Sequence, residues 1–155
     1  MSNPSINLFT PLQHLRTLQP ESTPRFGIMN AQQMIEHLAM VVCICNGKIK
    51  VECKFPPERV AVFKSQFIAG DQDLPEGVQF DRSNTTPPPL RTASITGAIE
   101  LLEKEITLFH QVFEENPDQI FTHTFFGEMG FEEWKIFQRK HFRHHFKQFN
   151  LPLDF

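Results

Sequence analysis

Residues 134–148 read Trp-Lys-Ile-Phe-Gln-Arg-Lys-His-Phe-Arg-His-His-Phe-Lys-Gln, and this stretch decides the fold. It places three histidines, His141, His144 and His145, in what its apolar spacing predicts to be one amphipathic helix. At about 100° per residue, His141 and His145 lie about 40° apart on one helix face, beside Trp134. The opposite side carries Lys135, Arg139, Arg143 and Lys147. This pattern predicts that His141 and His145 point into the protein, where two ring nitrogens could bind one metal ion.

Composition narrows the class of protein. A chain of 155 residues predicts a single globular domain over residues 1–155. Seventeen phenylalanines, one tryptophan and no tyrosine supply a large core but exclude acid catalysis by a phenol. The net charge of −3, with acidic and basic residues interspersed, argues against binding to nucleic acid or to an anionic membrane surface.

Cysteine usage and the absence of long apolar segments predict the compartment. Cys43, Cys45 and Cys53 are an odd number without a Cys-x-x-Cys pair, which is typical of free thiols in a reducing environment. The first ten residues lack the basic start and apolar run of a signal peptide, and no later segment has about 18 consecutive apolar residues. We therefore expect a soluble cytoplasmic protein.

Two helices are predicted before residue 50. Thr10 and Pro11 begin a short lead-in helix, and Asn30 caps a longer helix over residues 31–46. The inner stripe of the longer helix is Met34, His37, Leu38, Val41 and Cys45. His37 is therefore a single imidazole in an apolar seam.

Later segments alternate between helix and connection. Residues 58–67 have helical spacing, whereas residues 69–93 are rich in proline and predict a long surface crossover. Ser94 caps the next helix, and residues 121–130 form a Gly- and Phe-rich connection to the last helix, which ends at Asn150. The core stripe after Ser94 is Ile95, Ile99, Leu102, Ile106, Phe109 and Phe113. The prediction is an all-α, up-and-down four-helix bundle with a short extra N-terminal helix and one long Pro-rich crossover loop.

Three histidines on facing helices suggest a metal site. His141 and His145, at i and i+4, have the spacing that lets one helix face supply two imidazoles to one ion. His37, on the inner stripe of a separate helix, supplies a third ligand as expected for a bundle, with Trp134 as the floor of the pocket. The alternatives are a surface histidine cluster or core histidines bonded to backbone. Three histidine ligands leave the fourth position of Zn²⁺ open, which is the catalytic pattern.

Other polar residues have weaker signals. Gln148 lies one turn beyond His145 and either orients that ligand or is a neutral packing amide. His123 precedes Phe125 and either reaches the mouth of the site as a helper in catalysis or is a solvated loop histidine. His144 suits the rim of the site, and two histidines have no partner signal, His14 and His110.

Three motifs resemble the DinB-like superfamily of metal-binding four-helix bundles, in a branch of mostly unknown function. They are Phe26-Gly27-Ile28-Met29-Asn30-Ala31-Gln32-Gln33-Met34-Ile35-Glu36-His37-Leu38, then His123-Thr124-Phe125-Phe126-Gly127 followed by Trp134, and finally His141-Phe142-Arg143-His144-His145-Phe146-Lys147-Gln148-Phe149. The resemblance implies that His37, His141 and His145 hold the metal, that homodimers are frequent, and that known activities are transfers or isomerisations using small cellular thiols. Thr124 replaces a usual Pro and Asn150 a usual Gly, which puts loop shape in doubt.

Together these features predict a metal-dependent enzyme with a small-molecule substrate. The metal, zinc or alternatively nickel, would activate a water or a small thiol for a transferase- or hydrolase-type reaction. The alternative is a non-catalytic, metal-stabilised helical bundle that acts through dimer or partner contacts. In that case Ile136 and Phe146, which point away from the histidine face, would meet the partner.

Overall fold

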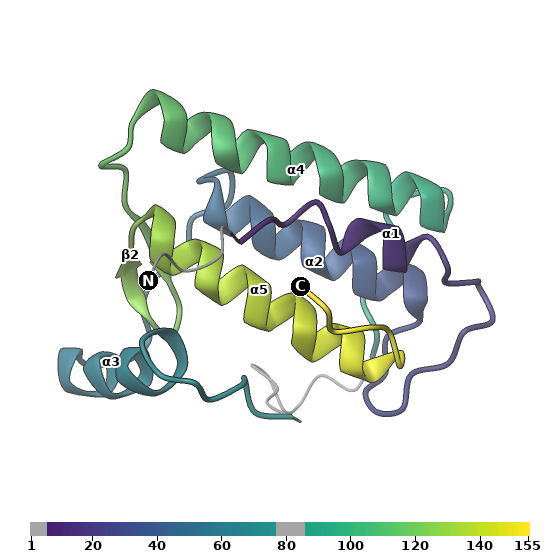
Figure 1. Ribbon diagram of the computed structural model, residues 1–155, viewed down its shortest axis with the longest axis horizontal. Helices are drawn as coiled ribbons and strands as arrows, with labels where there is room; N and C mark the ends of the chain where they lie inside the picture. Colours follow the sequence, from purple (N-terminus) through teal and green to yellow (C-terminus); the bar gives the residue numbers. More distant parts are fainter. Residues whose placement is uncertain (1–5, 77–85) are drawn as a thin grey trace.

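Three long helices form the body of the protein, seen here in a computed structural model that describes residues 6–76 and 86–155. They are α2 (Ala31–Cys45), α4 (Ile95–Glu115) and α5 (Phe131–Gln148). The three run side by side, with α2 in contact with both of the others (Figure 1). Within the two described ranges, no helix combines the length and apolarity that a bilayer crossing requires.

Short elements complete the fold. Helix α1 (Leu12–Leu15) packs against α4, and α3 (Pro57–Phe63) continues into a π-helical turn, η1 (Lys64–Ile68), that contacts α5. Strands β1 (Phe121–His123) and β2 (Gly127–Met129) pair antiparallel. The protein is therefore mostly helical with a small sheet. The all-α prediction missed this hairpin because three-residue strands are too short to show an alternating pattern.

Local signals in the sequence set the starts of α2 and α4 and the end of α5 as predicted, whereas α1 begins after Pro11 without a side-chain cap from Thr10. The Asn30 side chain accepts a hydrogen bond from Gln33 N, and Gln33 Oε1 accepts one from Asn30 N, both at 2.8 Å. This reciprocal pair is a capping box. Ser94 Oγ accepts from Gly97 N at 3.0 Å and begins α4. After α5, Asn150 has φ +53°, the left-handed conformation that ends many helices.

The core stripe of α4 is confirmed, because all of its predicted members except the half-buried Ile95 are buried. The non-catalytic alternative expects Ile136 and Phe146 to face a partner. Phe146 is 0 % exposed, and Ile136 is half-buried and packs against the core. That prediction is wrong for Phe146 because the C-terminal tail folds back over α5, where the Phe155 ring centroid lies 5.0 Å from that of Phe146.

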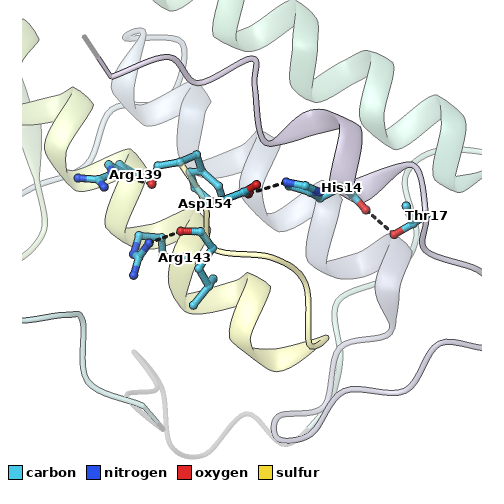
Figure 2. Close-up of polar contacts among 7 residues, drawn as sticks. His14, Thr17, Arg139, Arg143 and Asp154 are labelled. Atoms are coloured by element: carbon cyan, nitrogen blue, oxygen red, sulfur yellow. Dashed lines mark hydrogen bonds and ion pairs between the residues drawn. The ribbon is translucent and has the colours of Figure 1, made fainter. Parts of the chain in front are cut away.

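Polar contacts hold the tail in this position (Figure 2). Arg139 Nε and a guanidinium nitrogen of Arg143 donate hydrogen bonds to backbone carbonyls of the tail at 2.9 and 2.6 Å. His14 Nε2 lies 2.8 Å from Asp154 Oδ1, so a histidine without a partner signal joins α1 to the tail. The basic side of α5 is therefore partly covered by the chain's own C-terminal segment.

The predicted crossover is fastened to the helices at both of its described ends. Near its start, Lys140 Nζ donates to the carbonyl oxygens of Gly70 and Gln72 at 2.8 and 2.7 Å. Near its end, the buried Glu36 carboxylate accepts hydrogen bonds from the backbone N–H groups of Arg91 and Thr92, both at 2.9 Å. The stretch 77–85 of this predicted loop lies outside the described residues.

Candidate metal centre

Three imidazoles meet where α2 faces α5. His141 Nε2 lies 3.2 Å from His37 Nε2 and 3.0 Å from His145 Nε2. The three possible ligand atoms all lie within 4.8 Å of one another. Tetrahedral zinc with Zn–N bonds of 2.0–2.1 Å requires nitrogens about 3.3 Å apart. The two short nitrogen–nitrogen distances are already close to this value. These residues could hold a metal ion, as the sequence predicted.

Local helix geometry explains this convergence. The i, i+4 spacing brings the rings of His141 and His145 to a centroid distance of 4.6 Å, edge to face at 86°. Phe137, one turn before His141, stacks on its ring at 5.4 Å with an interplanar angle of 12°. Phe137 is not among the residues predicted for the site, although its position four residues before His141 is a usable signal in the sequence. Packing thus fixes the plane of the His141 ring.

Burial keeps these rings uncharged. His141 and His145 are 9 % and 5 % exposed, and His37 is half-buried. Burial lowers the pKa of His37 to about 4, with a smaller effect from the charge of His144. Burial also lowers the pKa of His141 and His145 well below the usual range, and the neighbouring histidines lower both further. Near pH 7 all three rings are neutral, the protonation state in which a nitrogen lone pair can bind a metal.

Gln148 contacts one of the three clustered histidines. Its Oε1 lies 2.7 Å from His145 Nδ1. Because a neutral imidazole has one N–H and an amide oxygen only accepts, Nδ1 carries the hydrogen and Nε2 presents its lone pair to the other two histidines. The contact fits the predicted role for Gln148 of orienting a ligand rather than that of a neutral packing amide. Its predicted part in catalysis remains a proposal.

Gly27 lies close to this amide, a role that no sequence pattern predicts. It has φ +86°, and a Cβ built on it would lie 3.1 Å from Gln148 Nε2. Any other residue would be strained in this backbone conformation and would crowd the amide. The loop before α2 therefore approaches the end of α5 at a position that requires glycine.

His123 is not a solvated loop histidine. It is 6 % exposed, and its Nδ1 accepts hydrogen bonds from the backbone N–H groups of Phe125 and Phe126 at 3.0 and 3.3 Å. Burial lowers its pKa to about 3. Its ring packs 4.5 Å from that of Phe137, which in turn stacks on His141. His123 thus holds the hairpin turn and lies behind Phe137, outside the cluster of three histidines.

Of the remaining aromatic residues, some lie near the histidine cluster and others lie away from it. His144 is half-buried, with its ring 4.9 Å from that of His145, as predicted for a residue at the rim. Trp134 is fully buried and packs against His123 at 5.6 Å. His110 stacks on Phe9 and borders a surface cavity of about 490 Å³ that includes none of the three clustered histidines. The free cysteines also lie outside the cluster.

Comparison of the chain with protein-family models, with curated proteins and with solved structures finds no match. The case for a function therefore rests on the geometry of the histidine cluster and on the motifs that carry it.

Proposed function

We propose that the protein is a metal-dependent enzyme in which His37, His141 and His145 hold a divalent ion that activates a water or a small thiol. The observation that carries this proposal is the convergence of three neutral ring nitrogens from two helices, with separations of 3.2 and 3.0 Å to His141 Nε2. Three imidazoles suit zinc best, and nickel is the second choice.

The donor set fits a catalytic rather than a structural site. Structural zinc sites are closed by four protein ligands, whereas three histidines leave one position for a water or substrate. Among residues 6–76 and 86–155, His37, His141 and His145 are the one group of ligand-type side chains close enough to share an ion. A bound zinc ion would lower the pKa of a coordinated water or thiol toward neutrality.

The protein's own residues supply orientation and exclude water. Gln148 holds the His145 tautomer, and Phe137 holds the plane of the His141 ring. Both of these ligands are nearly inaccessible, whereas His37 is half-buried, so we infer that substrate approaches on the His37 side. His123, which contacts Phe137, is proposed to support catalysis through this packing.

Metal analysis tests the site. Protein purified without a nickel column should contain about one equivalent of metal, and His141→Ala should abolish it. His110→Ala, which changes a half-buried histidine outside the cluster, should retain the metal. Zinc added to metal-free protein should raise its thermal midpoint, because a ligand that binds only the folded state stabilises it. A midpoint that zinc and nickel leave unchanged would count decisively against the proposal.

Activity separates the enzyme from a non-catalytic, metal-stabilised bundle. The loaded protein should accelerate consumption of a small thiol by a simple electrophile such as an aryl chloride, in which the thiol sulfur displaces chloride and releases a proton. Parallel assays with an activated ester would detect hydrolysis instead. Metal-loaded protein with no rate above background in either assay would favour the non-catalytic alternative.

The finer assignments belong to the same proposal. We propose that α3 and η1 act as the fourth helix of an up-and-down bundle, and that the chain is a DinB-like domain of the cytoplasm that forms homodimers. In α3 only Val60 and Phe63 are half-buried and the other residues are exposed, which is compatible with a peripheral helix. Neither nucleic acid nor a membrane is among the proposed partners, because the net charge is −3.

A further inference from the structure

A polar stripe runs along the buried face of α5. Positions 134, 138, 141, 145 and 148 fall within about 80° of arc at 100° per residue. All five side chains are buried: Trp134 0 %, Gln138 1 %, His141 9 %, His145 5 % and Gln148 7 %. Such a stripe in a hydrophobic core needs hydrogen-bond partners along its whole length.

The two halves of this stripe differ in their partners. On the C-terminal side, Gln148 is bonded to His145, and His145 belongs to the histidine cluster. On the N-terminal side, Trp134 Nε1 and both amide atoms of Gln138 have no hydrogen-bond partner in the described part of the chain.

These unpaired polar atoms do not stabilise the core by packing. A buried donor or acceptor without a partner costs about 1–3 kcal/mol, and an isosteric methionine would fill the place of Gln138 without that cost. Polar groups that violate the rules of core packing are expected at functional sites. Gln138 lies one helical turn before His141, a spacing that places Cβ atoms about 5–6 Å apart. Gln138 therefore lies beside a proposed metal ligand in the helix, and Trp134 lies one further turn toward the helix N-terminus.

We propose that Gln138 and Trp134 form the polar subsite for a small carboxylate that binds at the three-histidine centre. This inference rests on the proposed function and deepens it by naming the substrate class. The two residues offer three N–H donors, two from the amide and one from the indole, against a single acceptor oxygen. A carboxylate has one oxygen for the metal and a second that accepts from these donors, so it complements a donor-rich site next to a cation.

Binding of acetate to cobalt-loaded protein tests the subsite. Cobalt(II) replaces zinc at imidazole sites and gives visible absorption bands that change when a fourth ligand binds. Gln138→Met should raise the dissociation constant of acetate about tenfold, which corresponds to ~1.4 kcal/mol. Its affinity for cobalt should match that of the unmodified protein. Gln66→Met, the same change at an exposed position, should affect neither affinity.

A second variant tests the subsite independently, in case Gln138→Met does not fold. Trp134→Phe removes the indole donor and keeps an aromatic ring, and it should raise the acetate dissociation constant about threefold to tenfold, the effect of one hydrogen bond. The cobalt spectrum without acetate should be unchanged in both variants, which shows that the metal ligands are intact.

Each other outcome overturns the inference. If cobalt binds and acetate binds equally to all four proteins, or to none, the subsite is refuted while the metal site stands. If Gln138→Met only raises the thermal midpoint of the metal-free protein, the amide is merely unsatisfied. If the unmodified protein binds no cobalt, the proposed function fails and the subsite fails with it.

Discussion

Replacing Gln148 by methionine should weaken metal binding without touching a metal ligand. The amide oxygen of Gln148 lies 2.7 Å from His145 Nδ1 and holds the hydrogen on that nitrogen. Methionine has similar length and fills the same buried space, but its thioether is only a weak acceptor. In the variant the His145 ring loses the contact that directs its Nε2 toward His37 and His141.

The size of the effect follows from this contact. One hydrogen bond contributes about 0.5–1.5 kcal/mol, and loss of a group that orients a metal-bound histidine costs about 10–100-fold in metal affinity. Because the Gln148 side chain is 7 % exposed, water cannot readily replace the lost acceptor. We therefore expect the zinc dissociation constant to rise about 10–100-fold, which corresponds to ~1.4–2.8 kcal/mol.

Competition with a chromophoric chelator measures this change. The unmodified protein, Gln148→Met and the surface control Gln66→Met are each titrated against the same chelator–zinc complex at pH 7.5. Urea unfolding of the metal-free proteins checks that the core is intact. An affinity of Gln148→Met within threefold of the unmodified protein would refute the claim that this hydrogen bond sets the ligand tautomer.

Three further predictions concern the surroundings of the site. Gly27→Ala should lower the free energy of unfolding by about 1 kcal/mol or more, since φ is +86°, and urea unfolding measures this effect. It should also weaken zinc binding, since the new Cβ would crowd the Gln148 amide at 3.1 Å, and the chelator titration measures that effect. The metal-free protein should lose stability below pH 6.5, because burial lowers the pKa of His37 to about 4 and that of His123 to about 3, so the unfolded chain binds more protons than the folded one. The stability that depends on a neutral His37 is fully present above pH 6.5, and about 3 kcal/mol of it is lost by pH 4. Urea unfolding across that pH range measures this loss. Glu36→Gln should cost about 1–3 kcal/mol in urea unfolding, because an amide N–H would face the backbone donors that the carboxylate now accepts from; an unchanged midpoint would show that this anchor is dispensable.

Much of the fold could be predicted from signals that lie within a single segment of the sequence. Asn30 and Ser94 were predicted as helix caps because the capping bond closes within three residues. The histidine cluster was predictable for a related reason: the i, i+4 spacing orients His141 and His145 together, and the buried stripe of α2 leaves His37 facing them. In these cases the side chain and its partner belong to regular helices, whose geometry is known before the structure.

Features that depend on long-range contacts could not be predicted in this way. The burial of Phe146 depends on the C-terminal tail, which has no regular structure and is held by arginine contacts to its backbone. The sequence leaves His123 either as a helper at the mouth of the site or as a solvated loop histidine, because it lies in a connection, yet its Nδ1 accepts a hydrogen bond within the hairpin turn. The partners of Gln138 could not be judged at all from sequence, since an amide in a helix seam is equally compatible with a bonded and an unbonded state.

The position of the three clustered histidines links the candidate site to the crossover connection. The three histidines come from two helices, so a bound ion would cross-link α2 to α5. Glu36, the residue directly before His37, accepts the hydrogen bonds that fasten Arg91 and Thr92 to α2. A shift of α2 on metal binding would therefore move the end of the crossover together with His37.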